Sequence, residues 1–446
     1  RFFYHRRRTV RMETLDGLQA PGLTLPAVGL GPHHGLPIRR QDEARALMLA
    51  ESAGIAAERA QMTQAQGEIV AVGATVDIPD GAEVRDASGM VIMPGIVDTH
   101  SHIGQVSGAD SSAAIQPDVR ALDSINVRDS SIARARSGGV TTANIMPGSG
   151  WLMSGQTFYM HLGEGNTIED YAWMDDDGNI MGGMKMANGT NPLRESPVFP
   201  STRARSAAMV RQHFVAAQEY CEGERSPRDI GMDAMCEVLD GSRLVHFHTH
   251  RSDDIMTALR LRREFGFDLL IQHGIESYQV AQEIAAEGIP VSAILVDSPG
   301  GKLEAANANI ETAAALEQAG VFLSLHSDDN ILDSRLMFRH AGLAVRGGMS
   351  RDGALRALTI NGAVQLGLDD RVGSLEPGKL ADFIVLTGDP LSVYTNVAET
   401  WVMGALLFDA SDPEDLLHAT GGYGAGNPQM NTHVLEREAH MLEGAQ

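Results

Sequence analysis

Two histidines, His100 and His102, stand two positions apart in the segment DTHSH, which ends an apolar run. Side chains two positions apart in a β-strand point to the same face. Two neutral imidazoles on one face can share a cation, because imidazole nitrogen suits Zn²⁺ and similar divalent metals. The pair alone is a weak signal, since most histidines pack in a core or lie at the surface. It becomes a strong signal when further ligand types occupy matching positions.

Three more apolar runs end in residues that bind metals or carry protons. The run HFHTH places His246, His248 and His250 on one face, and only one or two of them can reach a metal at its end. We expect His246 to pack in the interior and His250 to be a pocket residue or a partner that orients a ligand. His273 follows LLIQ. Asp328 lies in LHSDD, where a carboxylate can bind a metal and also take a proton from water.

Two neighbours of Asp328 have structural interpretations. Asp329 points to the opposite face of its strand, so we expect it to cap a helix or a loop. His326 faces inward two positions before Asp328, and we expect it to pack or to orient a ligand.

Lysine is rare in this chain. Only Lys185, Lys302 and Lys379 are lysines, against thirty-two arginines, and a base-composition bias in the gene explains most of the replacement. A lysine kept in GGMKMANG suggests chemistry that a guanidinium lacks, such as carboxylation of the Lys185 amine to a carbamate that bridges two cations. Lys302, in a glycine-rich loop, is expected either to touch substrate or to cap the loop. Lys379, in the turn EPGKLAD, is expected to be structural.

Apolar runs and amphipathic stretches alternate along the chain, which is typical of a parallel sheet covered by helices. The predicted strands are residues 91–100, 139–146, 155–162, 180–188, 244–250, 269–274, 289–296 and 321–328. The predicted helices include residues 202–222, 254–265, 277–287 and 304–319. Eight units over ~250 residues have the size of a (β/α)8 TIM-like barrel, whose active sites lie at the carboxyl ends of the strands. An open doubly wound sheet normally has a glycine fingerprint after its first strand, and none is there.

Short β-branched runs broken by Gly, Asp and Pro flank this region. Residues 67–94 and 372–410 share this texture, so we expect them to pair in one small β-sheet subdomain beside a barrel of residues 95–371. Residues 1–66 show no alternating strand pattern, and residues 41–66 have a helical composition. Residues 411–446 are expected to form a C-terminal tail.

The composition narrows the partners. The net charge of −23 argues against nucleic acid and anionic membranes. There is no run of ~18 apolar residues that would form a transmembrane helix. The two cysteines, Cys221 and Cys236, show no metal-ligand spacing, and we expect them to be incidental. The basic start lacks an apolar signal region, so the cytoplasm is the default location, although the chain has no initiating Met and a leader could have been removed.

Motifs in chain order resemble the amidohydrolase superfamily, in its imidazolonepropionase-related and prolidase-like branch. They are VIMPGIVDTHSH, GGVTTANIMPGS, GGMKMANG, HTHRSDDI, IQHG, LHSDD and ALTINGAVQLGLDDRVGSLEPGKLADFIVL, and they span residues 67–409. The resemblance implies an α/β fold: a distorted (β/α)8 barrel with one or two divalent metals, most often Zn, beside a small β-sandwich built from both chain ends. It also implies a homo-oligomer.

Carried over by position, the resemblance assigns six metal ligands. These are His100, His102, Lys185 (as a carboxylated lysine), His248, His273 and Asp328. With one metal, His100, His102, His248 and Asp328 hold it. With two, Lys185 bridges them and His248 and His273 hold the second. Two departures from the family pattern are residues 1–66, which lack its initial strands, and residues 189–202, which look like an inserted lid.

The expected function is metal-dependent hydrolysis of a C–N bond, amide or cyclic amide or amidine, in a small-molecule substrate. Asp328 is the expected general base, and His250 or His273 helps to polarise the carbonyl. A dipeptidase or prolidase-like peptidase is the alternative, and a non-catalytic scaffold or a metal-buffering protein is a weaker one. Candidates for substrate contacts are Arg194, Arg203, Arg205, Arg251, Gln156 and His161, the last two with ordinary packing as an equal alternative.

Overall fold

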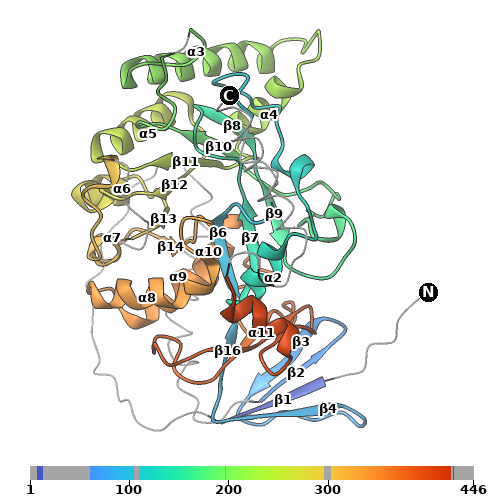
Figure 1. Cartoon of the computed structure of the whole chain (residues 1–446). Coiled ribbons are helices and arrows are strands. Elements are labelled where there is room, and N and C mark those ends of the chain that lie inside the picture. Colours follow the sequence, from blue (N-terminus) through green and yellow to red (C-terminus); the bar gives the residue numbers. More distant parts are fainter. Residues whose placement is uncertain are drawn as a thin grey trace, which may run out of the picture.

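The computed structural model describes residues 8–13, 61–104, 110–195, 197–295, 303–422 and 425. Helices and strands alternate through the larger part of the chain, and two small sheets lie at one end of it (Figure 1). The fold is therefore α/β with an additional β-rich part. Lys302 and residues 426–446 lie outside the described residues.

The first small sheet contains two strands from a segment in which no strand was expected. β1 (Arg8–Glu13) pairs with β2 (Gln61–Ala65) and with β4 (Glu83–Ser88), and β3 (Glu68–Gly73) pairs with β2. The expectation that this segment holds no strand was wrong. Residues 61–65, at the end of the stretch 41–66 with helical composition, form β2 and not a helix. Residues 41–60 lie outside the described residues.

The second small sheet joins residues 91–94 with strands of residues 372–410. The expectation that all of residues 67–94 share this sheet was wrong, because β3 and β4 pair in the first sheet instead. The order of the second sheet is β17-β16-β15-β5, and all its neighbours are antiparallel. The strands are β5 (Val91–Pro94), β15 (Phe383–Leu386), β16 (Val397–Val402) and β17 (Ala405–Asp409). Phe383 stacks on Trp401 in a buried cluster that also holds Met62 and Ile69 of the first sheet. The two small sheets therefore share one core.

Parallel strands form the centre of the larger part. The strand order is β14-β13-β12-β11-β10-β8 in one sheet and β6-β7-β9 in the other, and only β8 and β9 are antiparallel to their neighbours in these two sheets. The strands are β6 (Ile96–Ser101), β7 (Val140–Ile145), β8 (Met153–Gln156), β9 (Phe158–His161), β10 (Met184–Ala187), β11 (Val245–Thr249), β12 (Leu269–His273), β13 (Val291–Ala293) and β14 (Leu323–Leu325). The amide N–H of Asp328 donates to His100 O, and Ser101 bridges to Asp329, so the chain after β14 lies beside β6.

Two strand predictions needed correction. Residues 91–100 divide into β5, in a small sheet, and β6, in the large part. Residues 155–162 were expected to be one strand of a parallel sheet, but they belong to β8 and β9, which run antiparallel to β10 and β7. Gly155 lies in this region with φ 118°, and a Cβ there would meet Val119 O at 2.3 Å.

Helices flank the sheets of the chain (Figure 1). They are α2 (Ser130–Ser137), α3 (Arg203–Glu222), α4 (Ile230–Asp240), α5 (Ser252–Phe265), α6 (Ala281–Ala286), α7 (Thr312–Ala319), α8 (Met337–Arg346), α9 (Arg351–Leu358), α10 (Ile360–Leu366) and α11 (Pro413–Thr420). Thr202 begins α3 by accepting a hydrogen bond from Arg205 N, as expected of an N-cap. The predicted helix 304–319 begins instead with the 3-10 turn η4 (Leu303–Ala305) and continues as α7. In the segment expected to be a tail, α11 packs against α2.

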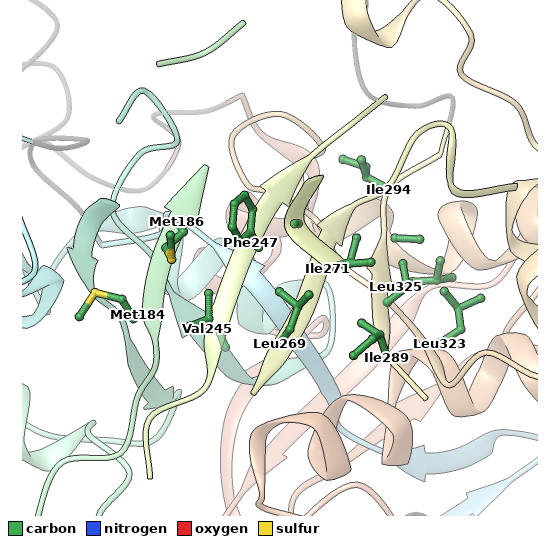
Figure 2. Packing of buried hydrophobic residues seen from close by; sticks show 14 of the residues in the cluster. Met184, Met186, Val245, Phe247, Leu269, Ile271, Ile289, Ile294, Leu323 and Leu325 are labelled. Carbon is green, nitrogen blue, oxygen red and sulfur yellow. The ribbon is translucent and has the colours of Figure 1, made fainter. Parts of the chain in front are cut away.

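The core of the large part is continuous across its strands. Met186, Phe247, Ile271 and Leu325 are fully or almost fully buried and lie on β10, β11, β12 and β14 of the same sheet (Figure 2). These apolar side chains alternate with the polar ones of the same strands, because neighbouring residues in a strand face opposite sides. The polar side chains therefore face a common interior.

The expectation that the two cysteines are incidental was wrong. Cys221 in α3 and Cys236 in α4 form a disulfide with a Cα–Cα distance of 5.6 Å. Among the described residues, no helix is both long and apolar enough to cross a membrane.

Candidate functional site

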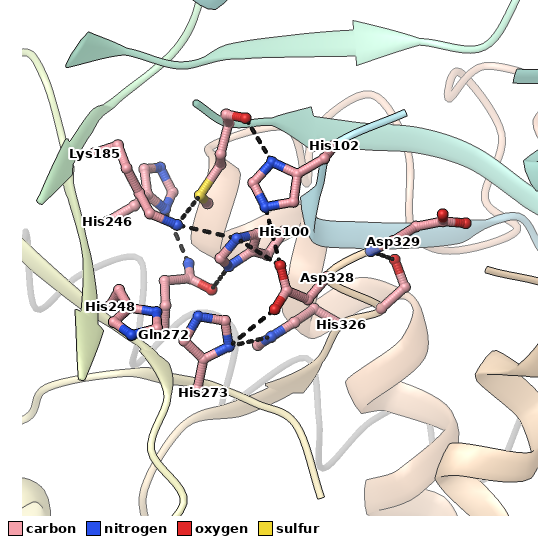
Figure 3. A network of polar contacts seen from close by, with 12 residues as sticks. His100, His102, Lys185, His246, His248, Gln272, His273, His326, Asp328 and Asp329 are labelled. Atoms are coloured by element: carbon pink, nitrogen blue, oxygen red, sulfur yellow. Dashed lines mark hydrogen bonds and ion pairs between the residues drawn. The ribbon is translucent and has the colours of Figure 1, made fainter. Parts of the chain in front are cut away.

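Three predicted ligands meet at the ends of β6 and β14. His100 Nε2 lies 3.3 Å from Asp328 Oδ1, and His102 Nε2 lies 3.0 Å from the same oxygen (Figure 3). Metal bonds of 2.0–2.2 Å place neighbouring ligand atoms ~2.8–3.5 Å apart. The three side chains therefore have the spacing of ligands around one ion.

The hydrogen bond of His102 fixes which of its nitrogens faces Asp328. Its Nδ1 lies 2.7 Å from Met146 O, a carbonyl that can only accept, so Nδ1 carries the proton. Nε2 then presents a lone pair to a carboxylate oxygen, and two acceptors at 3.0 Å require a proton or a cation between them. This donor set fits a divalent metal.

Buried partners hold the ring of His100 with Nε2 close to Asp328. Its Nδ1 lies 3.1 Å from Gln272 Oε1, and its Nε2 lies 3.0 Å from Lys185 Nζ. Burial, followed by the nearby positive charge of Lys185, holds the pKa of His100 well below its usual value. A neutral imidazole is the form that binds metal.

Lys185 lies inside the site and not at the surface. Its side chain is fully buried on β10, and Nζ contacts His100 Nε2 at 3.0 Å and Met146 Sδ at 3.3 Å. The position next to a candidate ligand agrees with the interpretation that this lysine was kept for chemistry.

Asp328 sits in a turn that is held from two sides. Its φ is 52°, a left-handed conformation that is uncommon outside glycine. The carboxylate of Asp98 accepts hydrogen bonds from the amide and hydroxyl of Ser327. On the other side, Arg134 Nη2 donates to both oxygens of buried Asp329, at 2.9 and 3.2 Å. Asp329 thus anchors the loop, in agreement with the structural role expected of it.

Two carboxyl groups of this turn have shifted pKa values. Burial raises the pKa of Asp98 to about 7, against the hydrogen bonds from Ser327 that favour its ionised form. Burial would also raise the pKa of Asp328, but a proton held between its carboxylate and His102 Nε2, with the charge it brings, outweighs burial and leaves that pKa below the usual value. Asp328 is therefore ionised at neutral pH.

A second group of histidines lies at the ends of β11 and β12. The ring centroids of His248 and His250 are 4.5 Å apart, and that of His273 is 4.5 Å from His248 and 5.0 Å from His250. One ligand atom each from His248, His250 and Glu304 lies within 4.8 Å of the other two. Glu304, in η4, was missed because it stands first in the predicted helix 304–319, where an acidic residue is ordinary and gives no sign of a site. Its only signal was its place after the glycine-rich loop.

His246 and His326 are buried and hydrogen-bonded in the interior, as expected. His246 contacts Gln272 Nε2 at 3.1 Å and Asn144 Nδ2 at 3.2 Å, and burial lowers its pKa to about 3. His326 lies between Ser292 Oγ, at 2.7 Å, and His273 Nδ1, at 3.0 Å. Ligand atoms of His100, His273 and His326 also lie within 4.8 Å of one another, so His326 is close enough to orient His273 or to bind.

The candidate substrate contacts divide into paired and open side chains. Arg203 pairs with Asp254 and Arg251 with Asp253. Arg194 stacks on Phe199, 4.4 Å from its ring centroid, and donates to Asn191 O; no carboxylate among the described residues pairs with it.

The remaining candidates have other partners. His161 binds Asp382 at 2.7 Å, and Gln156 donates to Pro117 O, so both have the packing roles weighed as alternatives. Lys379 pairs with Glu376, as expected of a structural residue.

A surface hollow of about 390 Å³ lies beside the second histidine group. Its lining is Arg251, Ser252, Asp253, Glu276, Gln279, Leu303 and Asn307. Arg251 follows His250 and Leu303 precedes Glu304, so the lining of the hollow includes the sequence neighbours of these two residues. It is lined mainly by polar groups and has room for a small molecule.

Comparison with known proteins identifies the family of the chain. The sequence profile of the amidohydrolase family matches residues 226–407. The crystal structure of an amidohydrolase from Thermotoga maritima MSB8 is 34% identical, covers 78% of this chain and 95% of its own, and superimposes with a TM-score of 0.72. The chain belongs to the amidohydrolase family.

This chain spans very different shares of the lengths of its curated relatives. Amidohydrolase tasK of Hapsidospora irregularis is 26% identical over 75% of this chain, which spans only 38% of the length of that relative. Imidazolonepropionase of Sphingopyxis alaskensis is 23% identical over 73% of this chain and 85% of its own. The second of these relatives supports the imidazolonepropionase-related branch.

Proposed function

We propose that the protein is a metal-dependent hydrolase that cleaves C–N bonds of amides, cyclic amides or amidines in small molecules. The observation that carries the proposal is the convergence of His100, His102 and Asp328, with acceptor atoms that face one another at 3.0 Å. In a (β/α)8 barrel, which we propose for the parallel strands, this point lies at the catalytic end of the strands.

We propose Zn²⁺ as the ion, since two imidazoles and a carboxylate are ligand types that zinc prefers. When bound, such an ion supplies a water of lowered pKa and polarises a carbonyl. His248 completes the set of four if a single ion binds. A carbamate on Lys185 is the proposed alternative for two ions, because its Nζ lies beside His100 Nε2, with His248 and His273 holding the second ion. Enrichment with ¹³C carbon dioxide and carbon NMR would detect that carbamate.

The side chains of the chain itself would move the protons. Asp328 is ionised at neutral pH, so it can accept a proton from water and pass it to the leaving nitrogen. His273 Nδ1 is engaged by His326, and its Nε2 is buried without a hydrogen-bond partner among the described residues. That nitrogen can hold a cation or a substrate oxygen. His250, 5.0 Å from His273 between ring centroids, is the second candidate to polarise the carbonyl.

A dipeptidase is the second candidate function, and one observation favours it. Arg194 lacks a carboxylate partner among the described residues and is linked through Asn191 to His248, which lies 3.0 Å from Asn191 Nδ2. A guanidinium in that place suits the terminal carboxylate of a peptide. Turnover of acyl-dipeptides that is lost in Arg194→Met would support this function over hydrolysis of uncharged cyclic amides.

The test of the proposed function is Asp328→Asn, assayed against a panel of acyl-dipeptides and cyclic amides or amidines. We expect turnover to fall at least ~100-fold, because the proton acceptor is lost. Circular dichroism should be unchanged, and metal content should change little, since an amide oxygen can still ligate. Equal turnover by the variant would contradict the role of Asp328 as the proton acceptor. No turnover of any substrate by the zinc-loaded wild type would support a non-catalytic scaffold.

Assembly and location are part of the proposal. We propose a homo-oligomer, which sedimentation velocity would test. The cytoplasm was the default expectation for location, whereas the Cys221–Cys236 disulfide is typical of oxidising compartments. Thiol titration of protein taken from its native cells would decide between the two.

A further inference from the structure

Glu304 is a buried carboxylate in which only one of the two oxygens accepts a hydrogen bond from the described residues. Its Oε2 accepts a hydrogen bond from Thr190 N at 2.8 Å and lies 3.7 Å from Arg203 Nη2. Its Oε1 is buried and has no hydrogen-bond partner among the described residues. The side chain is only 1% exposed, so water does not readily satisfy this oxygen. A buried acceptor of this kind requires a partner.

The charges around Glu304 do not balance. Arg203 Nε donates to both carboxylate oxygens of Asp254, at 3.0 and 2.9 Å, and only then reaches towards Glu304. One guanidinium thus faces two buried carboxylates, which leaves one negative charge. A buried unpaired charge is costly, and a cation near Oε1 would offset it.

Two imidazoles lie where such a cation would need further ligands. His248 and His250 each bring one nitrogen within 4.8 Å of a Glu304 oxygen and of one another, and all three residues are buried. Ligands on opposite sides of an ion with bonds of 2.0–2.2 Å are at most ~4.4 Å apart, so small side-chain movements close the set. Nitrogen ligands select Zn²⁺ or Co²⁺ over Mg²⁺ or Ca²⁺.

We propose that His248, His250 and Glu304 form a second divalent-cation site, beside the centre at His100, His102 and Asp328. The proposal rests on the proposed function and deepens it, because it places a second ion next to the hollow lined by Arg251 and Leu303. The carboxylate of this site comes from Glu304, so the second ion does not require a carbamate on Lys185.

Asn191 prepares His248 for this role. Its side-chain amide lies 3.0 Å from His248 Nε2, and the two ends of an amide are interchangeable at this distance. With its oxygen facing Nε2, the proton stays on Nε2, and Nδ1 is the nitrogen that carries the lone pair. Outer partners of this kind set the tautomer of metal-binding histidines.

The test is a titration of metal-free protein with Zn²⁺ by isothermal calorimetry, repeated with Co²⁺ by visible absorption. We expect two equivalents in the wild type and one in Glu304→Gln, with affinity for the second ion lowered at least ~10-fold. Glu276→Gln is the matched control. It removes a nearby buried glutamate, whose oxygens bind Ser252 N and Asn307 Nδ2, and should keep both equivalents.

Three further variants separate the possible failures. Lys185→Met should still bind the second equivalent of metal. If Lys185→Met loses the second equivalent and Glu304→Gln keeps it, the proposal is overturned in favour of a carbamate. A single equivalent in the wild type also overturns it. His250→Asn gives an independent check if Glu304→Gln folds poorly. Asp328→Asn should not affect the second equivalent, so two bound ions without turnover of any substrate would contradict the proposed hydrolase but not this site.

Discussion

Asp328 can act as a base only if its turn is held still, and two sets of buried contacts hold it. The left-handed backbone at Asp328 has a cost, which its neighbours offset. Asp98 binds Ser327 on one side, and Arg134 binds Asp329 on the other. We therefore interpret Arg134 as a positioning residue that acts through Asp329.

Arg134→Met should be strongly destabilising. It leaves Asp329, which is 2% exposed, as an unpaired buried carboxylate, and breaking such a pair costs about 3–5 kcal/mol. Urea unfolding of the metal-free protein would measure this change. The control is Arg211→Met, which removes an ion pair with Glu264 at the surface and should cost less than ~1 kcal/mol. Similar losses in the two variants would refute the buried-anchor interpretation.

The residues that the sequence revealed are those that obey a strand period. His100 and His102 could be paired because they stand two positions apart on one strand, and His273 and Asp328 because each follows an apolar run. Glu304 obeys no such period, since it lies on a 3-10 turn after a loop. Its neighbours in the site come from other elements and could not be foreseen from spacing.

At the scale of elements, a disulfide ties two neighbouring helices. Cys221 lies near the end of α3 and Cys236 within α4, at a sequence separation of 15. A cross-link of this kind restricts the unfolded chain more than the folded one. The interpretation of these cysteines as incidental failed because two cysteines far from any motif give no sign of which helices will pack together.

Reduction of this disulfide should lower stability without removing the metal site. A closed loop of 15 residues corresponds to about 3 kcal/mol. We expect no free thiols in the oxidised, denatured protein and two after reduction, with a lower midpoint of urea unfolding. Cys221→Ser/Cys236→Ser should match the reduced protein and should not respond to reductant. Two free thiols in unreduced protein would contradict the bond.

Helices were predicted better than the irregular strands, for a physical reason. The amphipathic period and N-cap of α3 place its limits within one residue of the prediction. In contrast, β8 and β9 are buried almost throughout, so no polar alternation distinguishes parallel from antiparallel pairing there. The strands near the start of the chain gave no alternating pattern at all.

At the scale of the whole molecule, the interior holds many neutral histidines. Burial lowers the pKa of His326 to about 3 and that of His340 to about 4. In the unfolded chain these groups titrate near ~6.5. Below that pH the unfolded state binds their protons first, so each histidine removes stability as the pH falls from ~6.5 towards its folded value.

His340→Gln should reduce this pH dependence. His340 Nε2 accepts a hydrogen bond from Leu295 N, and a glutamine oxygen can replace that acceptor without titrating. Between pH 7 and pH 5, the free energy of unfolding of the metal-free wild type should fall by about 2 kcal/mol more than that of the variant. Urea unfolding at both pH values measures the difference. Equal falls would show that His340 does not titrate as its burial implies.

Asp98 acts in the opposite direction without affecting that comparison. Its pKa is raised to about 7, so the folded state binds its proton first and gains stability as the pH falls from about 7. This contribution is the same in the wild type and in His340→Gln, and it cancels in their difference.

The meeting of β6 with the segment after β14 also has a consequence for the order in which the protein matures. His102 and Asp328 are 226 positions apart, yet they touch at 3.0 Å. During synthesis the first two histidines leave the ribosome long before their carboxylate partner, and long-range contacts of this kind form late in folding. A nascent chain therefore carries an incomplete set of ligands, and full metal affinity develops only near the end of translation.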